Sequence, residues 1–331
     1  MYNIRNFPKI ELHCHLDGSV RPSTIIELAK KENLELPTEN LKDFEKYVQV
    51  SSECKSLKDY LEKFDWPIKI MQKKENLKRV AFELIEDVSK QNVKYIEIRF
   101  APVFHLEQGL SYDDVIESVL AGLALGLEKF DVHSNLILSC MRHLSVDKSI
   151  EVVEAGKKYI GKGVVAVDLA GNEADFPPEL HKKAFDLAKS YGYHITIHAG
   201  ETGISKNITT AISELHAERI GHGVAAQNDE NVLDALKKST VCVEACPTSN
   251  IHTLAVENYS THPIKSFMNS KICTTVNTDN MTVSNVDLNK EYLHLQKELS
   301  FSDSELMELY KNGVEHSFAD SALKKQLMTF F

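Results

Sequence analysis

Short runs rich in β-branched residues alternate with longer amphipathic stretches along this 331-residue chain. The runs have the length and composition of buried parallel strands. There are eight of them, at 9–16, 95–102, 135–143, 164–171, 194–201, 219–223, 240–247 and 272–279, with helical patterns between them that include 23–31, 112–130, 178–191 and 231–238. Eight strands that alternate with helices in one undivided chain predict a closed (β/α)₈ barrel, the TIM barrel of the α/β class.

No repeat, low-complexity stretch or Pro/Gly/Ser linker divides the chain, so we expect residues 1–331 to form a single domain. An open doubly wound sheet is the rival architecture, but no predicted strand is followed by the glycine-rich phosphate loop that such sheets often carry. The connection from Asp17 to Lys94 is too long for a simple crossover and includes a helical pattern at 56–71. We interpret this helical insertion after strand one as a wall or lid on the C-terminal face, with ordinary helical padding as the alternative.

The net charge limits the kinds of binding partner, and the cysteine pattern indicates the state of the thiols. A formal net charge of −10 without a basic cluster argues against nucleic acid or an anionic membrane as the main partner. We find no signal peptide and no membrane-spanning run, and expect a cytoplasmic protein. The six cysteines form no CxxC pair, which predicts reduced and mostly buried thiols. The oligomeric state cannot be inferred from these features.

Imidazole and carboxylate side chains fall at the ends of the predicted strands. His13 and His15 lie two residues apart on strand one, so both point to one face, which inside a barrel is the lumen. Strands five, six and eight end with His198, His222 and Asp279, and Glu201 follows His198 by three residues. The fold would bring all of them to the C-terminal end of the barrel.

These residues predict a metal site. His13, His15, His198 and Asp279 are ligands that suit one divalent cation, most simply Zn²⁺ at about 2.0–2.2 Å. A water at the open position would have its pKa lowered to roughly 7, and His222 would orient or deprotonate it, with Asp279 sharing the task. We expect one ion rather than two, because strand four ends in DLAG without a lysine that could bridge a second.

Seven segments together resemble the adenosine deaminase family of the metal-dependent amidohydrolase superfamily: ELHCHLDGS, CMRH, DLAGNE, HAGE, RIGHG, CPTSN and NTDN. They occur in the family's order from Glu11 to about Asn285, so the resemblance covers most of the chain. It implies a hydrolase that converts adenosine and 2′-deoxyadenosine to inosine and 2′-deoxyinosine with release of ammonia. In that reaction a metal-activated hydroxide attacks C6 of the purine.

The resemblance also implies roles for individual residues. Glu201 would donate a proton to N1, and burial by the substrate would raise its pKa so that the carboxyl is protonated near neutral pH. His222 would position and activate the hydroxide, with the Asp279 carboxylate beside it. The backbone N–H of Gly171 would contact N3, and Asp17 would accept hydrogen bonds from a ribose hydroxyl.

Further substrate contacts are expected from the insertion and from the end of strand eight. Animal members of the family carry a second aspartate where this chain has Asn280, whose neutral NH₂ group can donate directly to N7. An apolar stripe at helical spacing would cover the nucleoside, although packing of an inner helix face explains it equally well. The predicted substrate-binding set is therefore His15, Asp17, Gly171 and Asn280, with Leu57, Tyr60, Leu61 and Phe64 from the stripe.

Two alternatives remain open. A sister deaminase of adenine, of an N6-modified nucleotide or of another 6-aminopurine would use the same chemistry with a different pocket beyond N9. A nucleotide enzyme should add basic residues for phosphate, and none is evident near Asp17. A non-catalytic nucleoside-binding relative should have lost a ligand or the proton donor, whereas this chain keeps them all.

Overall fold

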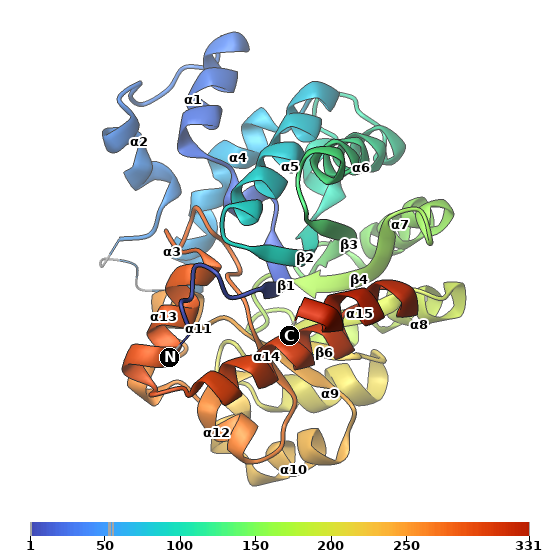
Figure 1. Cartoon of the computed structure of the whole chain (residues 1–331). Helices are drawn as coiled ribbons and strands as arrows, with labels where there is room; N and C mark the ends of the chain where they lie inside the picture. The colour runs from blue at the N-terminus through green and yellow to red at the C-terminus, as the bar shows by residue number, and fades with distance from the viewer. Residues whose placement is uncertain (1, 52–53, 55, 331) are drawn as a thin grey trace.

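The computed structural model describes residues 2–51, 54 and 56–330 of the chain. Eight parallel strands follow one another around a single sheet in the order β1 to β8 (Figure 1). Their bounds are β1 Lys9–His15, β2 Val93–Phe100, β3 His133–Met141, β4 Val164–Ala170, β5 His194–Ala199, β6 Arg219–His222, β7 Cys242–Ala245 and β8 Thr274–Val276. The predicted (β/α)₈ barrel is confirmed.

Between β1 and β2 the described residues form five α-helices, namely α1 Pro22–Lys31, α2 Leu41–Val48, α3 Leu57–Leu61, α4 Asp65–Ile70 and α5 Lys74–Ser89. One helix follows each of the next five strands: α6 Tyr112–Lys129, α7 Val146–Gly156, α8 Lys182–Tyr191, α9 Lys206–Glu214 and α10 Glu230–Lys238. The rest are α11 Pro247–His252 and α12 Ile264–Asn269 after β7, and α13 Leu288–Glu298, α14 Asp303–His316 and α15 Ser321–Leu327 after β8.

Local sequence explains where several of these helices begin. Ser111 and Asp114 form a capping box at the start of α6, and Ser302 and Glu305 form another at the start of α14. Pro247 takes the first position of α11, where its missing N–H costs nothing. The strand predicted to reach Pro247 therefore ends at Ala245, because the chain turns directly into a helix.

The barrel closes between β8 and β1 through the segment that carries the predicted site. Strand β8 is shorter than predicted, but the backbone beyond it continues to pair: the Asp279 N–H donates to the His13 carbonyl at 2.8 Å, and the His15 N–H donates to the Asp279 carbonyl at 2.7 Å. The buried carboxylate of Glu11 accepts from the backbone N–H and the hydroxyl of Thr278, at 3.0 and 2.7 Å. The backbone hydrogen bonds that close the barrel are therefore also the ones that hold Asp279 in place.

A fully buried charge network fills the middle of the lumen. Arg219 on β6 bonds Glu97 on β2, and its Nε donates to Glu244 Oε1 on β7 at 2.6 Å. Arg99 on β2 donates to Glu244 Oε2 at 2.8 Å. Ionised groups removed from water remain stable only when they are paired and hydrogen-bonded in this way. The network therefore fixes the lumen beneath the predicted site.

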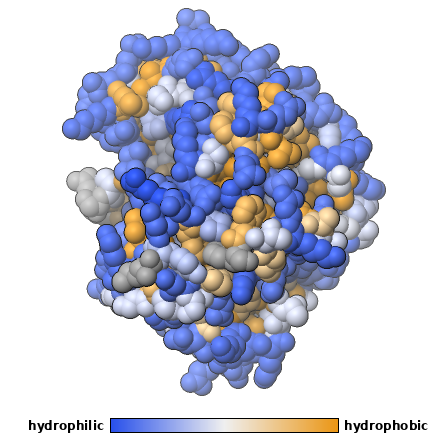
Figure 2. Space-filling view, in the orientation of Figure 1, coloured by the Kyte–Doolittle hydropathy of each residue, from blue (hydrophilic) through white to orange (hydrophobic). Residues whose placement is uncertain are grey.

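The face shown in Figure 2 is mostly hydrophilic, with smaller apolar areas between the charged side chains. No helix within the described part of the chain is long and apolar enough to cross a membrane.

The lumen network generates a stability prediction. Glu97→Gln should lower the free energy of unfolding by on the order of 3 kcal/mol, because it leaves the buried Arg219 charge partly uncompensated. Glu27→Gln is the matched control, since Glu27 makes an equivalent ion pair with Arg79 in an exposed position and should leave the unfolding midpoint nearly unchanged. Urea unfolding of both variants provides the measurement, and equal midpoints would contradict the role given to the network.

Candidate active site

A cavity of about 960 Å³, including its open mouth, lies at the C-terminal ends of the strands. This is the size of a small-molecule site. All but one of the predicted site residues line it: His15, Asp17, Leu57, Tyr60, Leu61, Phe64, Gly171, His198, Glu201, His222, Asp279 and Asn280. The exception, His13, is fully buried beneath the cavity floor. The structure therefore brings the whole predicted set to one place.

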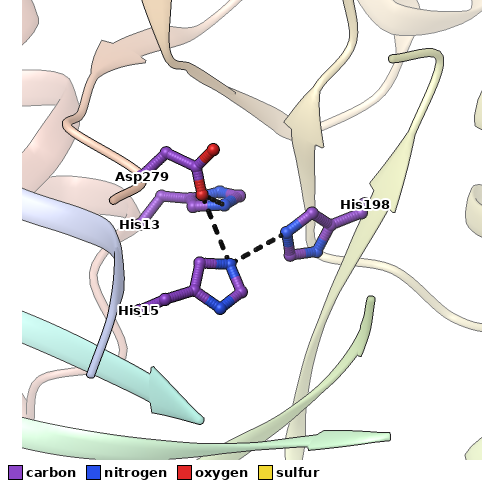
Figure 3. Close-up of side chains that lie close together, drawn as sticks. All are labelled: His13, His15, His198 and Asp279. Carbon is purple, nitrogen blue, oxygen red and sulfur yellow. Dashed lines mark hydrogen bonds and ion pairs between the residues drawn. The ribbon is translucent and has the colours of Figure 1, made fainter. Parts of the chain in front are cut away.

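The four predicted metal ligands converge at the floor of this cavity. Figure 3 shows that His13 and His15 extend from β1, His198 comes from β5, and Asp279 follows β8. His15 Nε2 lies 3.2 Å from His198 Nε2 and 3.4 Å from Asp279 Oδ1, and His13 Nε2 lies 3.3 Å from the same oxygen. One ligand atom from each residue lies within 4.8 Å of the others.

Buried carboxylates set the direction of two of these rings. Glu244 Oε2 accepts from His13 Nδ1 at 2.8 Å, and Asp168 Oδ1 accepts from His198 Nδ1 at 2.9 Å. With its Nδ1 hydrogen committed outward, each ring turns the lone pair of Nε2 toward the centre, as metal-ligating histidines do.

The donor set fits a divalent cation. His13 Nε2 is buried without a hydrogen-bond partner, which is costly unless a ligand takes up its lone pair. Burial lowers the pKa of His15 and of His198, so both rings are neutral and able to ligate at neutral pH. Gly221 on β6 leaves room for this arrangement, since a Cβ there would lie 2.9 Å from the His13 ring.

Glu201 is a buried acid beside the cluster. Burial, together with the nearby charges of Asp279 and Glu173, raises its pKa to about 8, so its carboxyl holds a proton at neutral pH. Glu173 accepts from the backbone N–H groups of Gly200 and Thr202, at 2.9 and 2.8 Å. These two bonds flank Glu201 and fix the turn that presents it to the cavity.

The segment CPTSN, which forms the start of α11, supports Asp279 and His222. Ser249 Oγ donates to Asp279 Oδ2 at 2.6 Å, which leaves Oδ1 facing the histidines. Asn250 Nδ2 lies 2.9 Å from His222 Nδ1. Both partners are fully buried, so these hydrogen bonds form away from competing water.

A chain of hydrogen bonds fixes the tautomer of His222. The backbone N–H of Ile264 donates to His262 Nδ1 at 3.2 Å, so the neutral His262 ring must carry its hydrogen on Nε2 and donate it to Asn250 Oδ1 at 3.1 Å. The Asn250 amide group then donates to His222 Nδ1. Since burial also lowers the pKa of His222 far below its ordinary value, the ring is neutral and presents Nε2–H, 3.8 Å from Glu201 Oε2.

The residues predicted to contact substrate lie around the rest of the wall. Asp17 is buried, which raises its pKa to about 7. The Tyr60 hydroxyl lies 2.7 Å from Ser284 Oγ and accepts from Asn280 Nδ2 at 3.0 Å. One of the two N–H groups of Asn280 is thus used within the protein. The Phe64 ring stands edge-on to His15, at 6.5 Å between centroids.

Several residues of the site are missing from the sequence-based set. The wall also includes Phe104, Ser139, Met141 and His143, and the support includes Arg99, Arg142, Asp168, Glu173, Glu244, Ser249, Asn250 and His262. The segments CMRH, DLAGNE and CPTSN contain seven of these positions, but the sequence analysis attached no role to them. Five positions lie in no such segment and are located only by the fold: Arg99, Phe104, Ser139, Glu244 and His262.

The barrel and its cluster of histidine, aspartate and buried glutamate side chains define a hydrolase of the amidohydrolase type. The family model for adenosine deaminase matches residues 8–330, and the chain belongs to the adenosine deaminase family. An adenosine deaminase of Clostridium kluyveri is 52% identical over 316 residues, which cover 96% of this chain and 91% of the relative. The membership that the seven segments indicated is confirmed.

Solved structures agree on the fold. The adenine deaminase of Arthrobacter aurescens superposes with a TM-score of 0.90 at 28% identity, covering 98% of both chains. An N6-mAMP deaminase of Arabidopsis superposes with a TM-score of 0.89 at 30% identity, covering 100% of this chain and 99% of that one. The same barrel thus serves deaminases that differ in what is attached to the purine.

The tautomer of His222 can be tested with Asn250→Asp. An aspartate cannot donate to His222 Nδ1, so the ring should shift its hydrogen to Nδ1 and lose the donor at Nε2. We expect kcat for deamination to fall by roughly 10²–10⁴-fold, with a smaller change in KM.

Nitrogen NMR of the imidazoles should show the change of tautomer directly. Asn258→Asp is the control, because Asn258 only caps a surface turn and an aspartate caps equally well. An unchanged kcat in Asn250→Asp would show that the tautomer does not matter.

Proposed function

We propose that this enzyme catalyses the hydrolytic deamination of adenosine and 2′-deoxyadenosine, in which water and the nucleoside give inosine or 2′-deoxyinosine and ammonia. The observation that carries the proposal is the joining, in one cavity, of a ligand cluster for a divalent cation with a protonated buried glutamate. Full-length similarity to curated adenosine deaminases supports it.

The charge of the cavity favours a nucleoside over a nucleotide. Within the described residues that line it there is no lysine or arginine, which a phosphate group would need. The Asp17 carboxyl, whose pKa of about 7 leaves it partly ionised at neutral pH, would instead disfavour a phosphate and accept a hydrogen bond from a sugar hydroxyl.

We assign His13, His15, His198 and Asp279 as the metal ligands and Zn²⁺ as the ion. When bound, such an ion supplies Lewis-acid activation of a water molecule at neutral pH. His222 Nε2–H would then hold the attacking oxygen in place, and Asp279 would take up the proton that the water releases. This division of labour follows from the hydrogen-bond chain behind His222, which makes the ring a donor rather than a base.

The remaining residues orient and activate the purine. The protonated Glu201 donates to N1, which draws electrons from C6 and prepares it for attack. Gly171 has a φ of +103°, a conformation open to glycine, and its backbone N–H is assigned to N3. The second N–H of Asn280 is assigned to N7, and Leu57, Tyr60, Leu61 and Phe64 cover the base.

The protonation role of Glu201 predicts the effect of Glu201→Gln. This variant should keep its metal content and lose roughly 10²–10⁴-fold in kcat, because a glutamine cannot donate the required proton. Glu214→Gln, at the exposed end of α9, should retain full activity.

The wild-type pH profile provides a second readout of Glu201. A carboxyl whose pKa is raised to about 8 is protonated below that pH, so kcat/KM should decline as the pH rises through about 8. A wild-type-like rate in Glu201→Gln, or a flat alkaline limb, would remove Glu201 from the mechanism.

A substrate panel tests the function itself. Adenosine and 2′-deoxyadenosine should be converted with the highest kcat/KM, whereas adenine and AMP should be poor substrates, as followed by the change from adenine to hypoxanthine absorbance. Metal analysis of the same sample should find a cation in the cluster. If the metal-loaded enzyme prefers adenine or AMP, the proposed substrate is wrong.

The same panel resolves the role of Asp17. Asp17→Ala should reduce kcat/KM for adenosine by roughly 10-fold or more, the value of a hydrogen bond to a charged group, and affect adenine much less. An equal loss with both substrates would indicate a structural role instead.

A further inference from the structure

A second cluster of metal-ligating side chains lies at the opposite end of the barrel. Cys242 begins β7, Cys273 directly precedes β8, and His316 ends α14. The register pairs Val243 with Thr274, so the two preceding cysteines stand side by side on neighbouring strands. The two thiol sulfurs and one imidazole nitrogen all lie within 4.8 Å of one another.

The surrounding structure holds these three residues in place. Cys242 is fully buried and is paired in register with Arg219 on β6. Arg219 Nη1 donates to the His316 carbonyl at 2.9 Å, which anchors the end of α14 beneath the barrel. The Arg219 guanidinium also stacks on Phe318, at 3.7 Å from the ring centroid, so the chain just beyond His316 is fixed as well. The cluster is therefore preorganised before any ion binds.

One side of the cluster is open to solvent. Cys273 and His316 are only half-buried, so an ion could enter between them and reach the buried thiol of Cys242. This entry lies at the N-terminal ends of the strands, whereas the catalytic cavity opens at their C-terminal ends. Ions at the two sites would not compete for ligands.

The chemistry of the cluster is selective. Two sulfurs with one imidazole suit Zn²⁺ and softer cations, and exclude Mg²⁺ and Ca²⁺, which prefer oxygen ligands. Cysteine ligates a metal as the thiolate, so binding would release the thiol protons of Cys242 and Cys273 to solvent. Water would complete a four-coordinate site.

We propose that Cys242, Cys273 and His316 form a second metal-binding site, for Zn²⁺ or a similarly thiophilic cation, separate from the catalytic cluster. Metal bound there ties the end of helix α14 to β7 and β8. The site stabilises the closed barrel from below and takes no part in the reaction.

Cobalt binding to the full-length, reduced protein tests this proposal. The apo-protein titrated with Co²⁺ should bind two equivalents, and one of them should produce the near-ultraviolet charge-transfer band of thiolate ligation, which the histidine and aspartate ligands of the cavity cannot produce. Cys273→Ser should abolish this band and one equivalent, while the other equivalent and the deaminase activity remain.

Two further variants sharpen the test. His316→Gln should weaken Co²⁺ binding at the thiolate site and alter its visible spectrum, since it removes only the nitrogen ligand. Cys54→Ser, which removes a half-buried thiol far from the cluster in sequence, should leave both equivalents and the band intact.

Three results would overturn the proposal. These are a single equivalent without a thiolate band in the reduced protein, a band that survives in Cys273→Ser, and a Cys242–Cys273 disulfide found by mass spectrometry in a protein whose reduced form binds only one equivalent. Because Cys273 and His316 are half-buried, their conservative variants should fold, and far-ultraviolet circular dichroism checks this.

Discussion

The hydrogen bonds that His13 donates to Glu244 and that His198 donates to Asp168 are the interactions on which the rest of the site depends. A neutral imidazole has one N–H and one lone pair, so committing the N–H to a buried carboxylate decides where the lone pair points. The carboxylates are themselves held by Arg99, which bonds Glu244 and lies 3.6 Å from Asp168. The charge network of the lumen is thus connected to the cavity floor through these two rings. The same residues therefore stabilise the barrel and orient the predicted metal ligands.

The hydrogen-bond chain behind His222 applies the same principle on the other side of the cavity. It begins at the backbone N–H of Ile264, which can only donate a hydrogen bond. This fixes the donor and acceptor atoms of His262 and Asn250 in turn, and finally those of the His222 ring in the cavity. Glu201 is set by a different force, since burial beside other acids keeps its proton on at neutral pH. One cavity therefore contains a donor fixed by hydrogen bonding and an acid fixed by desolvation.

Much of the barrel was predictable because its signal is local. Runs of β-branched residues locate all eight strands, and a histidine or aspartate at a strand end needs only the barrel to be placed at the C-terminal face. The limits of β7 and β8 were not predictable, because Cys246 continues the apolar run of β7 beyond its last residue, and the backbone after β8 goes on hydrogen-bonding to β1 as far as Asp279. The partners Glu244 and His262 were also beyond reach, since a buried carboxylate or imidazole has no sequence pattern that names its contact. Cys242 and Cys273 escape motif reasoning for the same reason, as they become neighbours only through strand register.

The seam between β8 and β1, formed by the backbone hydrogen bonds of Asp279 with His13 and His15, affects how this enzyme loses activity. The backbone of Asp279 joins the two strands, and the side chain of the same residue faces the three histidines. A fluctuation that parts this seam dismantles the ligand cluster while leaving the outer helices folded. Heat or mild denaturant should therefore abolish the activity of the enzyme before it loses its helical content. The catalytic centre should be the first part of the barrel to fail.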